Sequence, residues 1–381
     1  MESIRKVRIW PLPSQPPDLP PDLSNPIAAC ALTPAGPAWP EHRHRFVLEL
    51  VAAQTSGWSG PVSETVALIL AGELAPGLLG HDPTQHRALA HRPALGRHRH
   101  GAHASQAASA VEMACWDLAS RLVGEPVPAL LGGPVRSQVP LYASALGLDP
   151  AHPAAPEAAA WISQEGWWGQ KWPLPRNLVD EGPAALAAVL APLREAAGTQ
   201  ARFMIDGLGR CRVDQAKRLL PVLGDLDVAV AEDLTPHTAD LARLHGAADH
   251  WGVALAGGEH TLTARDQHAL LTNALLDVFQ LEPAWCGGLA TSLHAIDTAA
   301  ALGVPTLPHG DRVAASLALA SVCTAVAVPA LEWHLTLEPL RQHVFTEALQ
   351  PADGTLPAPT CPGLSAPPAV PASTAPQVVI A

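Results

Sequence analysis

Polar residues that each follow a short apolar run recur at nearly equal spacing along the second half of the chain. They lie 23 to 27 residues apart and are Asp206, Glu232, Glu259, Glu282, His309 and Glu332. A strand, a turn and a helix that returns to a parallel strand together occupy roughly 30 residues. Each interval therefore holds one strand–helix unit, and each polar residue marks the same end of a successive strand. In a closed barrel of parallel strands these ends meet at one mouth, where catalytic groups are found.

Strand and helix patterns alternate from residue 139 onward. Helical patterns such as 181–198 and 214–224 separate short apolar runs that are typical of buried strands. The predicted strands are 139–146, 166–174, 201–206, 227–232, 253–258, 276–282, 304–309 and 328–333. Eight strands with intervening helices is the number that a parallel barrel requires. The sequence therefore predicts an α/β fold built on a barrel.

The first third of the chain has a different pattern. Residues 11–40 are too rich in proline for a regular helix. Residues 46–54 alternate weakly between apolar and polar, as an antiparallel strand does, and residues 63–80 have helical spacing. Residues 104–124 have the strongest helical pattern, with Gly124 where a C-cap glycine belongs. These patterns predict an α+β domain that ends near residue 125.

Charge and cysteine usage narrow the classes of function. The 381 residues include 23 Lys+Arg and 35 Asp+Glu, a net charge of −12. An acidic chain without a long basic run is a poor partner for nucleic acid or an anionic membrane. The six cysteines are widely spaced without a CxxC pair, which is typical of reduced thiols in a cytoplasmic protein, and the first residues contain no apolar signal segment. The uncharged stretch 313–331 is interrupted by Pro329, so we expect a buried helix and a strand there rather than a membrane span.

Three of the strand-end acids are predicted to bind a metal ion. They follow three successive strands, and the third comes directly after a Gly-Gly pair that lets the backbone approach a crowded centre. Mg²⁺ takes oxygen ligands in octahedral geometry and keeps positions for water or substrate. Asp206, Glu232 and Glu259 are therefore the candidate Mg²⁺ ligands. The alternative is that these acids are solvated or pair with arginine.

His309 is the candidate general base, because Glu282 ends the preceding strand and a carboxylate beside an imidazole fixes its tautomer and raises its basicity. The alternative is a histidine that caps the next helix or binds the metal. Lys171, on the second strand, is expected to face the mouth from the opposite side, unless it is a surface lysine. Glu332 either donates a hydrogen bond in its protonated form or is a structural acid. The histidine-rich residues 86–103 fit no zinc pattern and are expected to form an exposed basic loop, which would help to hold an anionic substrate.

Over roughly residues 46–364 the chain resembles the mandelate racemase branch of the enolase superfamily. The phrases that carry the resemblance are GPVSETV, LLGHDP, SAVEMACWDLASRLVGEPVPALLGGPVRSQVPLYAS, GQKWP, FMID, AGGEHTLTARDQHALL, DVFQLEPAWCGGLATSLHAI, LPHGD and PADGTLPAP. Within this branch the chain is most similar to acid-sugar dehydratases of the rhamnonate type. The resemblance implies a modified TIM barrel, (β/α)7β, with an α+β N-terminal capping domain that the C-terminal segment completes. The corresponding ranges are 1–125 for the capping domain, 126–340 for the barrel, and 341–381 for the returning segment with a flexible tail.

The resemblance also implies the chemistry of the site. It places Mg²⁺ on Asp206, Glu232 and Glu259, a base and its partner on His309 and Glu282, and substrate contacts on Lys171 and Glu332. Three features depart from the family pattern. The partner of the base is usually Asp, Gly207 stands where a polar residue often follows the first ligand, and only one lysine lies on the second strand. The single lysine favours a dehydratase that uses histidine over a racemase that uses lysine.

The sequence thus predicts a Mg²⁺-dependent hydro-lyase that acts on a sugar acid. In this hypothesis His309 removes the proton α to the substrate carboxylate, an enediolate forms, and loss of the β-hydroxyl gives a 2-keto-3-deoxy acid. One alternative is an epimerase, racemase or cycloisomerase that uses Lys171 on the opposite face. Another is a non-catalytic relative that binds a carboxylate. We expect a cytoplasmic homo-oligomer whose partner is a small carboxylate, and the residues do not specify which sugar acid.

Overall fold

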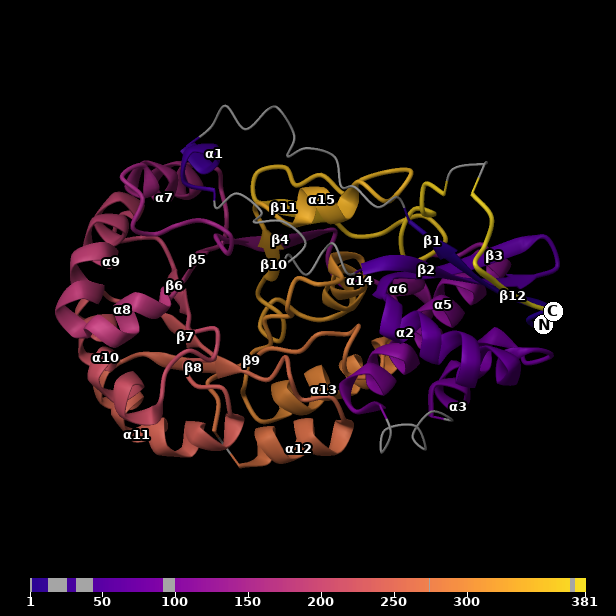
Figure 1. Cartoon of the computed structure of the whole chain (residues 1–381), viewed down its shortest axis with the longest axis horizontal. Helices are drawn as coiled ribbons and strands as arrows, with labels where there is room; N and C mark the ends of the chain where they lie inside the picture. The colour runs from indigo at the N-terminus through magenta and orange to yellow at the C-terminus, as the bar shows by residue number, and fades with distance from the viewer. Residues whose placement is uncertain (1, 13–25, 32–43, 92–99, 274, 371–373) are drawn as a thin grey trace.

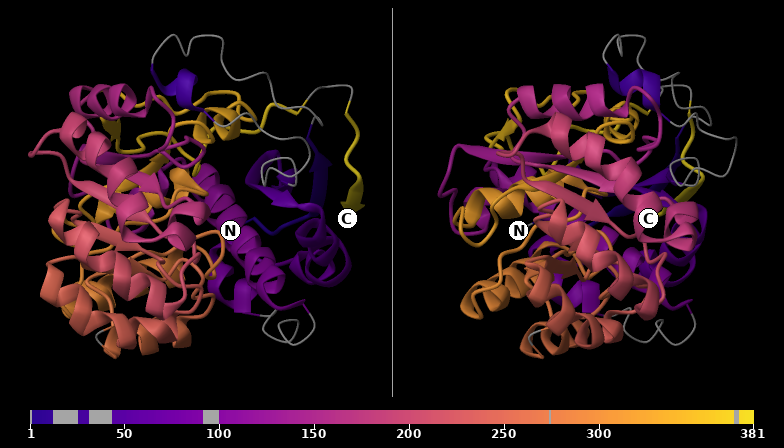
Figure 2. Two further views of the ribbon diagram at one scale, coloured as in Figure 1. Left: turned by 60° about the vertical axis from the view of Figure 1, so that its left-hand side comes forward. Right: turned by 90° about the vertical axis from the view of Figure 1, so that its left-hand side faces the viewer.

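The computed structural model shows a ring of alternating strands and helices beside a smaller sheet-and-helix domain (Figure 1). It describes residues 2–12, 26–31, 44–91, 100–273, 275–370 and 374–381. One long helix, α5 (Ala102–Val123), runs between the small sheet and the ring (Figure 2). The predicted fold class, a modified α/β barrel with an α+β capping domain completed by the C-terminal segment, is confirmed.

The capping domain contains a four-stranded antiparallel sheet in the order β12-β1-β2-β3. Its strands are β1 Lys6–Pro11, β2 His44–Ala52, β3 Thr55–Ser63 and β12 Val378–Ile380. The antiparallel strand predicted over 46–54 is confirmed by β2. The flexible tail expected at the end of the chain is not irregular at its last residues, because Val7 of β1 lies opposite Ile380 of β12. Three residues of β12 are too few to make a periodic pattern, so only its distant partner strand identifies it.

Helix α5 covers one side of this sheet. Its buried face includes Ala107, Val111, Ala114 and Leu118, and it ends at Gly124 in the left-handed conformation with φ 76°. The helix predicted over 104–124 is therefore confirmed. Strand β3 approaches the helix at Gly57, where an added Cβ would overlap the backbone of Leu118. The sheet and α5 thus pack backbone against backbone at this point.

We expect Gly57→Ala to destabilise the protein by about 1–3 kcal/mol, since a methyl group in a filled contact forces the backbone to shift. Thermal unfolding followed by circular dichroism would measure the loss. The matched control is Gly72→Ala, because an added Cβ at Gly72 meets no atom within 4 Å. Equal melting temperatures for the two variants would show that β3 and α5 do not pack as closely as described.

Residues 63–80 are helical as predicted, but they do not form one α-helix. α2 (Glu64–Ile69) begins after Ser63, whose side chain accepts a hydrogen bond from Val66 N at 3.3 Å. It continues as a π-helix, Leu70–Leu74, and a 3₁₀ helix, Ala75–Leu78. Pro76 has no N–H to donate, which explains why the α-helical pattern does not persist.

Two predictions for the loops of this domain are wrong in part. The proline-rich residues 11–40 contain a five-residue helix, α1 (Pro26–Cys30), because proline is tolerated at the first helical position. The histidine-rich residues 86–103 begin with α3 (His86–His91), after a 3₁₀ turn at Pro83–Gln85. Much of the proline-rich segment and residues 92–99 lie outside the described residues.

The ring is a parallel sheet in the order β10-β4-β5-β6-β7-β8-β9. Its strands are β4 Gln138–Ser144, β5 Gln170–Pro173, β6 Phe203–Asp206, β7 Val230–Glu232, β8 Ala254–Gly257, β9 Val278–Phe279 and β10 Leu331–His334. β10 pairs with β4, so the last strand lies beside the first. A short strand, β11 (Thr355–Pro357), adds to β4 in the antiparallel direction.

Residues 304–309 fill the position between β9 and β10, but they are not a regular strand. Leu307 N donates to Phe279 O at 2.8 Å on one side, and Glu332 N donates to Pro308 O at 3.3 Å on the other. The prolines at 305 and 308 have no N–H, which removes ladder bonds that a regular strand needs. The strand predicted at 304–309, the seventh of the eight, is therefore present in place but reduced to isolated bonds.

Helices surround the ring on its outer side (Figure 1). They are α6 Val127–Leu130, α7 Ala155–Gln164, α8 Arg176–Glu181, α9 Pro183–Ala197, α10 Val213–Asp225, the 3₁₀ turn Thr238–Asp240, α11 Leu241–Trp251, α12 Ala264–Thr272, α13 Leu289–Ala301 and α14 Val313–Val322. A further short helix, α15 (Glu338–Gln342), follows β10 and lies toward the capping domain. The interior is packed by side chains such as Tyr142, Met204, Val230 and Leu307. The uncharged stretch 313–331 is α14 and the approach to β10, as predicted. Among the described residues, none of the helices has the length and apolar character to cross a membrane.

Candidate active site

The polar residues that end the barrel strands gather at one mouth. Asp206 is the last residue of β6, Glu232 is the last residue of β7, and Glu332 lies in β10. Glu259 and Glu282 follow β8 and β9 by two and three residues. Because the strands are parallel, all of these positions lie at the same end of the barrel. The structure therefore brings together the residues predicted from the sequence.

Lys171 lies at the centre of this cluster rather than on the surface, with its side chain 2% exposed. Its Nζ is 2.5 Å from Glu232 Oε2, 2.9 Å from Glu332 Oε1 and 3.3 Å from Asp206 Oδ2. Burial opposes protonation of Lys171, but the neighbouring carboxylates outweigh it and hold its pKa well above the ordinary value. The lysine is therefore an ammonium group that neutralises part of the acidic cluster.

The acids around Lys171 do not share one electrostatic environment. Burial raises the pKa of Asp206, and raises that of Glu232 further, although Lys171 opposes both shifts. Burial also disfavours the charge on Glu332, but the positive charges of Lys171 and His309 and the contact with Lys171 outweigh it and hold its pKa well below the usual range. Glu332 accepts a hydrogen bond from Gly310 N at 3.0 Å. It is an ionised acceptor here, not the protonated donor that was one of its two predicted forms.

His309 lies between two carboxylates. Its Nδ1 is 3.1 Å from Glu282 Oε2, and its Nε2 is 3.2 Å from Glu259 Oε2. Burial lowers the pKa of His309, but Glu259 and Glu282 outweigh burial and raise it to about 10. Contacts with His309 and His260 overcome the burial of Glu259 and lower the pKa of this carboxylate to about 2. The predicted pairing of His309 with Glu282 is present in the geometry.

Glu282 is held rigidly although it is one methylene longer than aspartate. Its Oε1 accepts a hydrogen bond from Ala284 N at 2.8 Å, and its Oε2 accepts one from Asp311 N at 2.9 Å. Burial raises its pKa, against the opposing effect of His309. Two backbone donors therefore aim the longer side chain at Nδ1 of His309.

The donor chemistry of the mouth fits a hard divalent cation. Asp206, Glu232 and Glu259 supply carboxylate oxygens from three adjacent strands. The pKa values of Asp206 and Glu232 are raised even though Lys171 lies beside them, so a further positive charge would stabilise their ionised forms. Within the described residues, however, the donor atoms of these three do not all lie within 4.8 Å of one another, whereas those of Asp233, Glu259 and His260 do. Lys171 lies against Asp206 and Glu232, while Glu259 turns to His309 and His260. A cavity of about 240 Å³ opens beside these acids, lined in part by Asp206, Asp233 and Glu259.

Sequence reasoning missed four polar residues at this mouth. Burial, Glu259 and Asp206 raise the pKa of Asp233 to about 7. His260 Nε2 lies 3.0 Å from Glu259 Oε1, and Gln280 Nε2 donates to Glu232 Oε2 at 2.7 Å. Burial lowers the pKa of His334 to about 3, so this imidazole is neutral. Asp233 and His260 each follow a candidate ligand directly, and His334 follows Glu332 by two residues on the same strand face; those adjacencies were the available signal.

The family follows from the sequence itself. Residues 154–370 match the enolase C-terminal domain-like family, and residues 50–132 match the N-terminal domain of the mandelate racemase / muconate lactonizing enzymes. The first match covers more than half of the chain. The protein belongs to the enolase superfamily. The resemblance that the motifs suggested is thereby confirmed at the level of the superfamily.

Solved structures with the same fold include enzymes of several types. A presumed dehydratase from Zymomonas mobilis ZM4 has 19% identity and a TM-score of 0.82, with 100% of both chains covered. The 3,6-anhydro-D-galactonate cycloisomerase from Zobellia galactanivorans has 22% identity and a TM-score of 0.74, covering 84% of this chain and 90% of that one. A racemase from Streptomyces coelicolor A3(2), solved with bound magnesium, has 24% identity and a TM-score of 0.70, covering 84% and 91%. At these identities the likeness establishes the shared fold.

For this enolase superfamily member, the structure explains glycine at position 207. An added Cβ there would overlap the backbone of Leu234, because the residues after β6 and β7 cross in close contact. Gly207 N also donates to Glu232 O at 2.7 Å. A larger residue after Asp206 would therefore displace the backbone next to Glu232. The close packing of these two segments explains why this chain has glycine where the family often has a polar residue.

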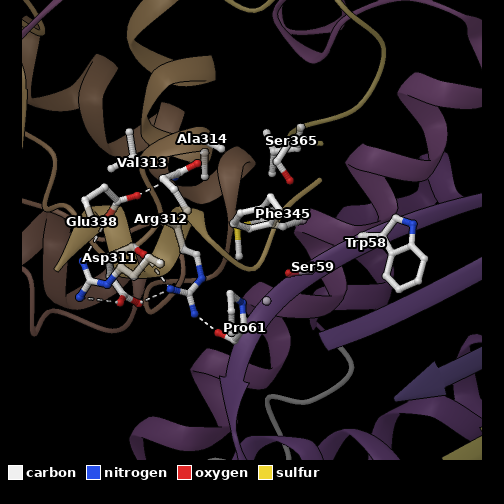
Figure 3. A pocket seen from close by; sticks show the side chains of 16 residues that line it. Trp58, Ser59, Pro61, Asp311, Arg312, Val313, Ala314, Glu338, Phe345 and Ser365 are labelled. Carbon is white, nitrogen blue, oxygen red and sulfur yellow. Dashed lines mark hydrogen bonds and ion pairs between the residues drawn. The ribbon is translucent and has the colours of Figure 1, made fainter. Parts of the chain in front are cut away.

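A second pocket lies where the capping domain meets the barrel, next to the residues that follow His309 (Figure 3). Arg312 spans this junction, since it donates to Pro61 O of the capping domain and to Asp311 O at 2.6 Å. Arg341 of α15 donates to Gly310 O at 2.6 Å. The loop after the candidate base is thus held by the capping domain and by the segment after β10 together.

Proposed function

We propose that this protein is a Mg²⁺-dependent dehydratase of a sugar acid. The observation that carries the proposal is the arrangement of His309, with Nδ1 on Glu282 and Nε2 directed at the carboxylate cluster. In this reaction the proton α to the substrate carboxylate is removed, the β-hydroxyl leaves, and tautomerisation gives a 2-keto-3-deoxy acid. Superfamily membership and a presumed dehydratase among the structures of the same fold support the proposal.

Asp206, Glu232 and Glu259 would hold the Mg²⁺ ion. When bound there, Mg²⁺ supplies positive charge that stabilises the negative charge developing on the substrate carboxylate. The oxygen-only donor set and the magnesium bound in the Streptomyces coelicolor racemase support this assignment. Lys171 offers a second positive charge within the same cluster, where it contacts Asp206, Glu232 and Glu332.

His309 would accept the α-proton at Nε2 when Glu259 is engaged in holding the cation. Glu259 would then no longer raise the pKa of His309, so Nε2 would be free of its proton. Its Nδ1–H donates to Glu282, which fixes the tautomer with the lone pair on Nε2, and Ala284 N and Asp311 N fix Glu282 in turn. The imidazolium that forms is stabilised by the buried carboxylate of Glu282. If the β-hydroxyl leaves on the same face, the proton on Nε2 can be returned to it, so a single residue serves both steps.

A racemase or epimerase on the same scaffold is the second candidate. Lys171 is the residue that would serve the opposite face of the substrate in this reaction, where its ammonium group would donate a proton from the same buried cluster as the acids. The racemase and the cycloisomerase among the structures of the same fold support this second candidate. In that reaction the α-proton exchanges but no keto acid forms.

We expect at least one acid in a library of aldonic and aldaric acids, incubated with the protein and MgCl₂, to give a 2-keto product. Semicarbazide detects the product by absorbance, and proton NMR in D₂O detects α-proton exchange in the same samples. Exchange without keto product would replace the dehydratase by the racemase or epimerase. Calorimetric Mg²⁺ binding without exchange in any acid would favour a non-catalytic carboxylate-binding protein.

A further inference from the structure

Glu112 belongs to α5 of the capping domain, yet its carboxylate binds the barrel. Its Oε2 accepts a hydrogen bond from Leu289 N at 2.8 Å, and its Oε1 accepts one from Ala290 N at 3.0 Å. These are the first two residues of α13, whose opening N–H groups have no partner within the helix. A carboxylate at a helix N-terminus is stabilised by these donors and by the helix dipole. The residue is 1% exposed, so a side chain of one domain caps a helix of the other in a dry environment.

A second residue of α5 strengthens this contact. Ser109, one turn before Glu112, accepts a hydrogen bond from Gly287 N at 2.8 Å through its Oγ. Gly288 has φ 87°, and an added Cβ there would overlap the carboxylate of Glu112. Glycine at this position therefore meets two needs, the left-handed backbone and the close approach of the carboxylate. Trp116 Nε1 donates to Glu112 Oε1 at 2.7 Å and fixes the orientation of the side chain.

The backbone that Glu112 holds is the segment that carries Glu282. Trp285 N and Cys286 N donate to Glu282 O at 3.0 and 3.2 Å, and Gly288 N donates to Pro283 O at 3.0 Å. Residues 282–288 thus form a turn that is closed by three backbone hydrogen bonds. One end of the turn holds His309 through Glu282, and the other end is held by α5.

The middle of the turn also contacts the candidate base. The indole of Trp285 packs against the imidazole of His309, with ring centroids 5.0 Å apart. Its Nε1 donates to Asp311 Oδ2 at 3.2 Å, and Asp311 N donates to Glu282. A displacement of the turn would therefore move both the hydrogen-bond partner and the packing partner of His309.

We propose that Glu112 is a positioning residue, which fixes residues 282–290 and through them the placement of Glu282 and Trp285 against His309. The inference rests on the proposed role of the Glu282–His309 pair. It makes the capping domain part of the proton-transfer apparatus, because docking of α5 on α13 is what orders the turn. Glu112 itself touches neither His309 nor the candidate metal ligands in the hydrogen bonds described above.

The capping domain offers a matched control in Glu49 of β2. Glu49 is 4% exposed and accepts a hydrogen bond from Trp10 Nε1 at 2.7 Å, as Glu112 does from Trp116. Its other partners, Arg8 and Ser56, also lie in the capping domain. Glu112→Gln and Glu49→Gln therefore remove the same charge from similar surroundings, and only the first loosens a contact to the barrel.

The experiment compares these two variants and the milder Ser109→Ala in the full-length protein. For Glu112→Gln we expect kcat to fall by roughly ten- to a hundredfold, since a small misplacement of a catalytic group costs up to about 10²-fold. The KM of the acid and the calorimetric Mg²⁺ affinity should change much less. Amide hydrogen exchange of residues 282–290 should accelerate, and the ring-proton NMR signal of His309 should shift as Trp285 moves. Glu49→Gln should be less stable but should keep its kcat, its amide exchange across residues 282–290 and its His309 signal. Ser109→Ala should show the same three changes as Glu112→Gln, to a smaller extent.

Two results would overturn the inference. The first is that amide exchange across residues 282–290 becomes faster in Glu112→Gln, but the kcat of this variant equals that of Glu49→Gln. The second is an unshifted His309 signal together with unchanged amide exchange in Glu112→Gln. Failure of the proposed function is a separate result, because it appears as absent α-proton exchange in the unmodified protein with every acid tested. In that event the NMR and amide-exchange comparison still decides whether Glu112 positions the turn and His309.

Discussion

His309→Asn should slow α-proton exchange and keto-acid formation by about 10²- to 10⁴-fold, the usual contribution of a positioned general base. Asparagine retains a polar group of similar reach but has no basic lone pair on an imidazole nitrogen. The hydrogen bonds of Glu282 to Ala284 N and Asp311 N do not depend on His309, so the surrounding turn should stay in place. Exchange measured by proton NMR in D₂O and product measured with semicarbazide would report the two steps separately.

The control for this variant is His250→Asn, at an exposed residue near the end of α11. It should keep both rates, and both variants should bind Mg²⁺. Exchange and turnover that survive in His309→Asn would exclude His309 from the mechanism. The contact of Nδ1 with Glu282 would then be a structural pair in the barrel mouth.

The positions of the candidate site residues were predictable because parallel strands impose a simple rule. Each strand–helix unit returns the chain to the same end of the barrel, so the spacing from Asp206 to Glu332 alone places these residues at one mouth. The same rule identifies a strand position at 304–309 even though its prolines prevent regular pairing. Local spacing is therefore a sufficient signal for the order of the strands and for the residues at their ends.

Side-chain direction and contacts between distant segments were not predictable in this way. Lys171 was placed at the mouth but not inside the cluster, because its three acidic partners come from β6, β7 and β10. β12 pairs with β1 from the opposite end of the chain, and no local pattern marks that pairing. In the sequence, Glu112 is simply one acidic residue of a predicted amphipathic helix. Only the docking of α5 on α13 shows that its carboxylate meets free backbone donors.

Loss of one candidate metal ligand should have the second large effect. For Glu232→Gln we expect Mg²⁺ affinity to fall by about 10²-fold or more, since even the partners of metal ligands are worth about 10- to 100-fold. Activity should fall with it. Glu232 is the central acid of the cluster, where it accepts hydrogen bonds from Lys171 at 2.5 Å and from Gln280 at 2.7 Å. Calorimetric titration with MgCl₂ would measure the affinity, and thermal unfolding would show whether the fold is kept.

Glu232→Gln should lower the Mg²⁺ affinity without lowering the stability of the fold. Burial and the neighbouring acids raise the pKa of Glu232, so a neutral amide at this position relieves repulsion in the metal-free protein. A neutral side chain with one oxygen is a poorer ligand for a hard cation, which prefers charged oxygens. In Glu232→Gln the Mg²⁺ affinity should therefore fall, while the melting temperature should stay the same or rise. Asp214→Asn, at an exposed acid on α10, should alter neither.

Metal removal provides an independent test of the same cluster. Treatment with EDTA should abolish α-proton exchange, and added MgCl₂ should restore it, because the buried acids cannot stabilise a developing negative charge without a cation. Asp206→Asn and Glu259→Gln should both resist restoration at MgCl₂ concentrations that restore the unmodified protein. If all three ligand variants bind Mg²⁺ normally, the ion binds elsewhere, and Asp233 with His260 is the adjacent group whose donor atoms already lie within 4.8 Å of Glu259. That result would remove the basis for assigning His309 as the base, because its Nε2 lies against Glu259, which would then hold no metal ion.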